Sequence, residues 1–400
     1  MVNHVIVHIG ADKTGSTSIQ TALDGYDDGR SFVPKFKYEH HHFELSLAFE
    51  DYDYFKTTKL FEAEYSDWSN EEVLVERARV RQLIMEALSC RKRRTVIFTG
   101  EGLRLMTSEA RLEMLELFAS YGCRTTIVAY VRDPIAYAAS AFQQQVKNAG
   151  RFVIQKKIKT NYDRLIKVFQ NMIPPNRLIV REFRKQVLHR HDVVHDFCKV
   201  TGITFKDSVY SNESMAWDAL KLVFGLNQIA KKHSLAGDRS KRLALVEAIM
   251  HLYKEHPKPE KLDFAELVDF STTDLLYQVS GIRFERPVDR GIRPKLDTLL
   301  TDLSTVDLAP FNQLLTSKGL THVDHDGVFK ALDLLQSKFD LMPDAKFSED
   351  ERHRSSIIGQ TVVFRDPEVT NSKWRKRLEP SELTRQFRKL RIKLNFYVGA

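Results

Sequence analysis

The chain has 400 residues, of which 42% are hydrophobic and 28% are charged, a composition typical of a globular protein with a sizeable core. This composition excludes a disordered chain and a collagen, and three cysteines far apart argue against a disulfide framework or a zinc-binding cysteine cluster. No stretch approaches the ~20 consecutive apolar residues of a membrane helix, and the start of the chain has a strand pattern rather than that of a secretory signal. We therefore expect a cytoplasmic protein.

The first half of the sequence alternates short, β-branched apolar runs with helical patterns. The expected strands cover residues 5–9, 95–98, 125–131 and 177–183. The expected helices cover residues 16–23, 71–88, 109–120, 134–146 and 193–200. Near-continuous apolar strands separated by helices predict a parallel sheet covered on both faces, and therefore the α/β class.

The remaining segments show weaker patterns. Residues 26–70 predict loops and short helices over the sheet, with aromatic side chains that either bind an acceptor sugar or lipid or belong to the core: Tyr38, Phe43, Tyr52, Tyr54 and Phe55. Beyond Asn212 strand patterns are scarce, and helices are expected over 217–232 and 241–253. We expect a core over residues 1–211 and a largely helical C-terminal region over 212–400 that belongs to the same domain. A domain boundary near residues 210–235 is the alternative.

Most of the net charge of +8 lies in one segment near the C-terminus. Residues 373–393 contain nine Lys or Arg side chains and two acidic ones. The basic residues alternate with apolar ones, as on an exposed helix face. A solvated terminus explains this pattern, and a surface that binds nucleic acid or an acidic membrane is the alternative.

A glycine-bearing loop joins the first expected strand to the first expected helix: Gly10-Ala-Asp-Lys-Thr-Gly-Ser-Thr17. Such a turn directs backbone N–H groups and a helix N-terminus at one point, which favours an anion. In the nucleoside-triphosphate pattern G-x-x-x-x-G-K-[ST], both glycines and the last threonine match, but Ser16 occupies the lysine position and the lysine is Lys13 instead. An earlier lysine lies nearer the 5′ end of a nucleotide, where it can neutralise a leaving phosphate without a metal ion. A glycine turn with a solvated lysine is the alternative.

A second motif follows the expected strand 125–131. Arg132 lies at the carboxyl end of that strand, where parallel sheets present ligand-binding residues. Pro134 suits the first turn of a helix, and Ser140 comes two turns later. An arginine fork and a serine hydroxyl can share one anion, which predicts a second phosphate site on the same ligand. On its own, Arg-Asp-Pro could be only a helix cap.

Together the two motifs resemble those of the PAPS-dependent sulfotransferases, particularly the bacterial P-loop members, over about residues 4–205. The family signature K-x-G-[ST]-[ST] matches Lys13 to Thr17, and an arginine followed by a serine eight positions later matches Arg132 and Ser140. The resemblance implies transfer of a sulfuryl group from PAPS (3′-phosphoadenosine 5′-phosphosulfate) to a hydroxyl of a saccharide, lipid or small molecule, without a metal. It also implies that the 3′-phosphate is bound by Arg132 and Ser140, and the 5′-phosphosulfate by Gly10, Lys13, Thr14, Gly15, Ser16 and Thr17.

Sulfuryl transfer also needs a base for the acceptor proton. In some members of this family the base follows the strand that precedes the 3′-phosphate motif, and here that residue is Glu101. Lys13 and Glu101 are therefore the expected catalytic residues. The alternatives are that Glu101 only caps the first turn of a helix, or that a residue of the run His40-His41-His42 is the base.

Two other functions remain open on sequence grounds. A nucleotide-dependent kinase or NTPase would share the core fold, although Ser16 replaces the lysine and no acidic magnesium site follows a strand. A binding protein that uses the basic C-terminal segment is the other. Nucleic acid is not the partner we expect.

Overall fold

The computed structural model describes residues 1–11, 13–37, 42–148, 160, 162–205, 214–232, 239–268, 282–284 and 295–341. The basic segment 373–393 lies outside the described residues. Within the described part of the chain, no helix is both long enough and apolar enough to cross a bilayer.

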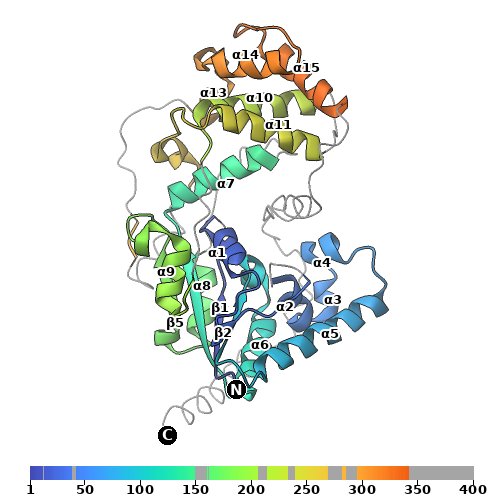
Figure 1. The fold of residues 1–400 in the computed structure, drawn as a ribbon, viewed down its shortest axis with the longest axis vertical. Coiled ribbons are helices and arrows are strands. Elements are labelled where there is room, and N and C mark those ends of the chain that lie inside the picture. Colours follow the sequence, from blue (N-terminus) through green and yellow to red (C-terminus); the bar gives the residue numbers. More distant parts are fainter. Residues whose placement is uncertain are drawn as a thin grey trace, which may run out of the picture. The chain divides into compact units, whose positions relative to one another are not determined.

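The first half of the chain forms a parallel sheet with the strand order β2-β3-β1-β4-β5, flanked by helices (Figure 1). Its strands are β1 (His4–His8), β2 (Ser31–Phe32), β3 (Thr95–Thr99), β4 (Arg124–Val131) and β5 (Leu178–Glu182). Helices separate successive strands, so the α/β class expected from the sequence is confirmed. The edge strand β2 was not expected, because two residues carry no recognisable period.

The alternating side chains of the strands enter two different clusters. Val5 and Val7 of β1 pack into one cluster with four helices: α2 (His42–Phe49), α5 (Asn70–Leu88), α6 (Ser108–Ser120) and α8 (Tyr162–Gln170). Ile6 points the other way and packs against α1 (Ser16–Leu23) and α9 (Val193–Thr201). Because successive residues of a strand face opposite sides, this pattern confirms a sheet covered on both faces.

The segment between β2 and β3 forms short helices and part of the core. It contains α3 (Tyr52–Phe55) and α4 (Lys59–Glu64) besides α2, as the sequence predicted. Phe43 and Phe55 are buried, whereas Tyr54 is 45% exposed. Two of the aromatic residues considered for an acceptor are therefore core residues, and Tyr38 lies outside the described residues.

The long helix α7 (Pro134–Asn148) follows β4 and carries the helical C-terminal region. Its apolar residues share a cluster with α10 (Trp217–Lys232), α11 (Arg239–Leu252) and the later helices. These later helices are the 3-10 turns η4 (Lys261–Leu267) and η6 (Leu303–Thr305), α13 (Leu296–Thr301), α14 (Leu308–Ser317) and α15 (Val328–Leu341). Helix α7 is thus the packing surface on which this region rests.

A buried carboxylate fixes α9 against the end of the sheet. Asp196 is fully buried and accepts hydrogen bonds from Arg181 (2.6 Å), the Tyr130 hydroxyl (3.0 Å) and the His189 N–H (2.9 Å). Burial alone would raise the pKa of Asp196, but the bonds from Arg181 and His189 hold it below its usual value. These contacts join β4, β5, the 3-10 turn η3 (His189–His191) and α9.

Candidate active site

The glycine-bearing loop follows β1 at the carboxyl edge of the sheet and bends through left-handed backbone. Its φ angles are +23° at Gly10, +64° at Lys13 and +78° at Gly15, which is the N-cap of α1. No side chain of a described residue caps the first turn of this helix. A helix N-terminus without such a cap favours an anion, and anion binding at this turn stays a prediction.

Glycine is needed at both ends of the loop because its neighbours leave no space. A Cβ atom at Gly10 would collide with the Ser16 hydroxyl. At Gly15 it would lie 2.8 Å from a ring carbon of Phe183 and 2.9 Å from a methyl carbon of Val193. The loop is thus pressed against the segment after β5 and against the first residue of α9, and this close contact fixes its shape.

Two of the predicted hydroxyl groups hold the loop itself. The buried Thr14 hydroxyl donates to the Ala11 carbonyl at 2.5 Å, and the buried Ser16 hydroxyl lies 3.4 Å from the same oxygen. Thr17 is exposed. In this arrangement Thr14 and Ser16 can contribute to anion binding through their backbone N–H groups, and Thr17 through its hydroxyl as well. Binding by these residues stays a prediction.

The two cationic motifs meet at this edge. Arg132 directly follows β4, the neighbour of β1, and its guanidinium donates to the Lys13 carbonyl at 2.9 Å. The same guanidinium lies 5.4 Å from the centre of the Phe183 ring, a cation–π distance. Burial lowers the pKa of Arg132 somewhat, although a guanidinium stays charged at any physiological pH. The pairing of Lys13 and Arg132 in space follows from the structure and does not depend on the family resemblance.

Helix α7 begins as the sequence predicted, with Asp133 accepting a hydrogen bond from the Ala136 N–H at 2.8 Å. Ser140 lies half-buried on this helix, and no hydrogen bond among the described residues joins it to Arg132. Its contact with a shared phosphate remains a prediction.

The expected base lies at the same edge of the sheet. Glu101 opens the 3-10 turn η1 (Glu101–Leu105) directly after β3, and the neighbouring Gly100 N–H donates to the His8 carbonyl at 3.0 Å. The N-cap of this turn is Gly100, so Glu101 is its first residue, and whether Glu101 caps the turn or serves as the base stays a prediction. The side chain of Glu101 is outside the described part of the structure, as are His40, His41 and the side chain of His42.

The sequence pattern did not indicate a role for His8, the last residue of β1. His8 is fully buried, bonds through Nδ1 to the Thr99 hydroxyl at 2.8 Å, and has no partner for Nε2 among the described residues. Burial lowers the pKa of His8 to about 3, so the ring is neutral. It ties the end of β1 to the end of β3, just before Glu101. The only signal was a polar residue within an apolar strand.

The sequence pattern also did not indicate a role for Lys147, a second lysine whose charge interacts with that of Lys13. Lys147 lies near the end of α7, and its pKa is lowered to about 8 by burial and by the positive charge of Lys13, against an opposing effect of Glu247. Lys147 lies seven residues, or two helical turns, after Ser140. This spacing puts both residues on the same face of the helix, which is the sequence pattern that indicates Lys147. The charges of Lys13 and Lys147 therefore affect each other, while Arg132 is hydrogen-bonded to the same loop as Lys13.

No family model and no curated protein sequence matches this chain. A crystal structure of a sulfotransferase from Alicyclobacillus acidocaldarius is 14% identical with a TM-score of 0.35, and the match covers 62% of this chain and 97% of that chain. The sulfotransferase domain from the curacin biosynthetic pathway is 13% identical with a TM-score of 0.31, covering 72% and 99%. This similarity assigns no role to any residue, so roles must come from the geometry of the loop and of Arg132.

Proposed function

We propose that this chain is a sulfotransferase that moves a sulfuryl group from PAPS to an acceptor hydroxyl. The observation that carries the proposal is the 2.9 Å hydrogen bond from Arg132 to the Lys13 carbonyl. It brings an arginine to the glycine-bearing loop and to a helix N-terminus that no side chain of a described residue caps. Two adjacent cationic groups suit a nucleotide that carries a phosphate at both its 3′ and 5′ positions.

The position of Lys13 favours sulfuryl transfer over ATP-dependent phosphoryl transfer. Residue 16, where a triphosphate-binding loop has its lysine, is a buried serine whose hydroxyl faces the Ala11 carbonyl. Lys13 instead lies within the bend of the loop, half-buried, with its carbonyl held by Arg132. This arrangement supports a lysine that serves the 5′-phosphate.

In the proposed reaction the acceptor oxygen forms a bond to sulfur while the bond from sulfur to the 5′-phosphate oxygen breaks. The Lys13 ammonium and the N–H groups of Gly15 and Ser16 neutralise the charge that develops on the leaving phosphate. The acceptor proton passes to the carboxylate of Glu101. Arg132 and Ser140 hold the 3′-phosphate, and Lys147 adds positive charge beside Lys13.

Two measurements test this function. Thermal unfolding is followed with PAPS and, separately, with ATP and Mg²⁺, because a ligand at 100 times its Kd stabilises a protein by about 2.7 kcal/mol. Transfer of labelled sulfate from PAPS is then measured over saccharides, lipids and phenols. Stabilisation by PAPS with transfer to one acceptor class is the expected result. Stabilisation by ATP and Mg²⁺ alone would instead establish a phosphoryl-transfer enzyme.

A further inference from the structure

A basic residue stands at the amino-terminal start of all five strands. His4 and Arg124 are the first residues of β1 and β4, whereas Arg30, Arg94 and Arg177 immediately precede β2, β3 and β5. Because the strands are parallel, their starts lie at one edge of the sheet. This amino edge is opposite the carboxyl edge that carries Lys13 and Arg132.

The backbone holds most of these residues side by side. The Arg94 N–H donates to the Arg30 carbonyl at 2.8 Å, the Asn3 N–H to the Arg94 carbonyl at 3.0 Å, and the Arg124 N–H to the Asn3 carbonyl at 3.0 Å. In the register of the sheet, His4 pairs with both Thr95 and Arg124. The cations are thus preorganised by the sheet and not by a flexible loop.

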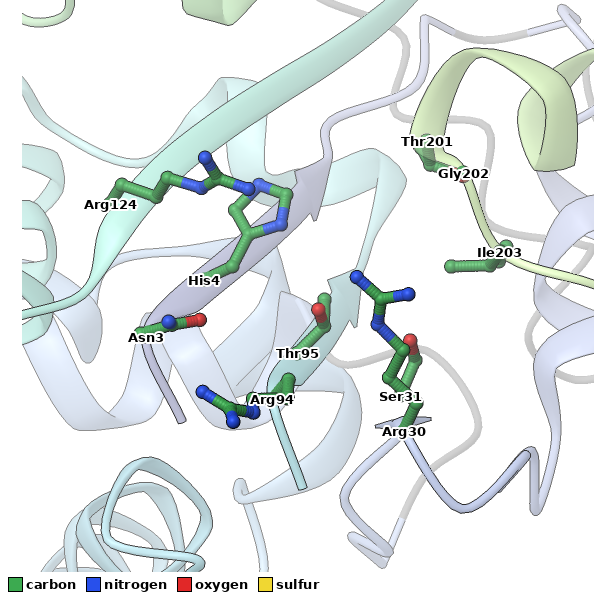
Figure 2. Close-up of a pocket in the computed structure, with 10 residues that line it drawn as sticks. All are labelled: Asn3, His4, Arg30, Ser31, Arg94, Thr95, Arg124, Thr201, Gly202 and Ile203. Atoms are coloured by element: carbon green, nitrogen blue, oxygen red, sulfur yellow. The ribbon is translucent and has the colours of Figure 1, made fainter. Parts of the chain in front are cut away.

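These residues line a pocket with a volume of about 650 Å³, bounded on the far side by the end of α9 at Thr201 to Ile203 (Figure 2). Figure 2 shows Arg124 lying alongside the His4 ring and Arg30 rising between Thr95 and Ile203. The volume falls within the range of about 300–1,000 Å³ that is usual for small-molecule sites. Every charged residue that lines this pocket is basic.

No carboxylate of a described residue pairs with the arginines of the pocket. The guanidinium groups of Arg30, Arg94 and Arg124 form no hydrogen bond or ion pair with any described residue. The nearby Asp27 is paired with Arg93 at 2.7 Å, outside the pocket lining. Asp28 accepts from the N–H groups of Arg30 (2.8 Å) and Ser31 (2.5 Å), so it caps the backbone turn before β2.

The pKa of His4 is lowered by its burial and by the neighbouring positive charges. Burial, Arg124 and Arg177 together lower the pKa of His4 to about 4, and its Nε2 bonds to the Thr126 hydroxyl at 2.9 Å. Beside the cations, the side chains of Ser31 and Thr95 are more than nine-tenths buried, and their hydroxyls bond to no other described residue. The described lining of the pocket therefore offers guanidinium groups and hydroxyl donors, and it contains no acidic side chain.

We propose that this amino-edge pocket is a second anion-binding site, for a small molecule that carries a phosphate or sulfate ester. A preorganised set of unpaired arginines in a concave site matches the planar, multi-oxygen geometry of such groups. Ile203 supplies an apolar wall for the organic part of the ligand, and Ser31 and Thr95 supply hydroxyl partners. The site is separate from the proposed donor site and does not depend on the proposed function.

The test uses the full chain with Lys13→Ala, which weakens anion binding at the carboxyl edge. Calorimetric titration with inorganic pyrophosphate should then show one binding site that weakens with added salt. Adding Arg30→Gln/Arg124→Gln should weaken this binding at least about tenfold, as expected on loss of charge-assisted bonds. The matched control Arg91→Gln/Lys92→Gln removes the same charge from exposed residues outside the pocket and should leave binding within about twofold. Circular dichroism and Tm confirm that each variant is folded.

A second arm identifies the source of the ester by comparing adenosine 3′,5′-bisphosphate with glucose 6-sulfate. Tighter binding of either one than of inorganic phosphate or sulfate supports the site and assigns it to nucleotides or to sulfated sugars. The proposal is overturned if pyrophosphate fails to bind the Lys13→Ala protein, or if the control pair weakens binding as much as the pocket pair. It is equally overturned if both organic esters bind more weakly than the inorganic anions.

Discussion

The two edges of the sheet are both basic, but they hold their positive charge by different means. At the carboxyl edge Lys13 lies in a left-handed bend, and Arg132 is half-buried and hydrogen-bonded to that bend. At the amino edge Arg30, Arg94 and Arg124 lie at strand starts, where backbone hydrogen bonds fix their positions. Their guanidinium groups are exposed and bond to no residue that the structure describes. A loop needs glycines and close contacts to place a cation, whereas strand starts need only the register of a parallel sheet.

Replacing Lys13 should cause the largest loss of activity, and it should affect the carboxyl edge without affecting the amino edge. Lys13→Ala should lower sulfate transfer by about 10³-fold, because a preorganised charge at a leaving phosphate is lost. Pyrophosphate binding at the amino edge should not change. Transfer of labelled sulfate and calorimetry measure the two effects on one preparation, with Lys92→Ala as the matched control. Transfer that survives in Lys13→Ala would contradict the role of this residue.

The next largest effect should come from the expected base. Glu101→Gln should leave PAPS binding nearly intact and reduce turnover by about 10²-fold, because the amide cannot accept the acceptor proton. Glu109→Gln, at an exposed position in the first turn of α6, is the control and should retain full turnover. Single-turnover rates with saturating PAPS make the measurement. Equal rates in both variants would remove Glu101 from the mechanism.

A smaller effect should come from replacing one arginine at each edge with alanine. Arg132→Ala should weaken PAPS binding by about tenfold to thirtyfold and should weaken binding of adenosine 5′-phosphosulfate much less, because the lost bonds are to the 3′-phosphate. Arg124→Ala should leave both donors unaffected and weaken only the amino-edge site. Competition titrations with the two nucleotides decide this. Equal binding of both donors by the wild-type chain would show that no 3′-phosphate site exists.

The smallest effect should be a pH dependence confined to the carboxyl edge. Lys147 is charged below pH 8 and loses its proton above it, since its pKa is about 8. Affinity for an anionic donor should therefore be highest below pH 8 and decline by about threefold to tenfold toward pH 9.5. Anion binding at the amino edge should stay constant over this range, because His4, with a pKa of about 4, is neutral throughout. Lys147→Met should abolish the decline, and a decline that persists in this variant would assign it to another group.

Most of the fold was predictable because apolar periodicity is a local property. The helices over residues 16–23 and 217–232 have the bounds that the pattern indicates, and the strand starting at Thr95 differs by one residue at its end. Beyond residue 295 the sequence predicted a helical region but not its individual helices, because their patterns are mixed. These helices pack on α10 and α11.

The candidate site was predictable only where residues lie close in sequence. Lys13 belongs to a recognisable loop motif. Arg132 directly follows an expected strand, so the sequence predicts that both residues lie at the carboxyl edge of the sheet. His8 could not be recognised, because its role depends on contact with Thr99, ninety-one residues away. The arginines of the amino edge are separated by tens of residues, and only the sheet register brings them together.

Helix α9 extends from the close contact with Gly15 at the carboxyl edge to the pocket at the amino edge. Helix α9 begins at Val193, in contact range of the position where a Cβ on Gly15 would stand, and its nine residues end at Thr201 beside the amino-edge pocket. At about 1.5 Å per residue, these nine residues span roughly 13 Å between the loop and the pocket. The close contact of Gly15 with Val193 and the hydrogen bonds of Asp196 hold the helix between the two edges. One element therefore borders both the proposed donor site and the amino-edge pocket.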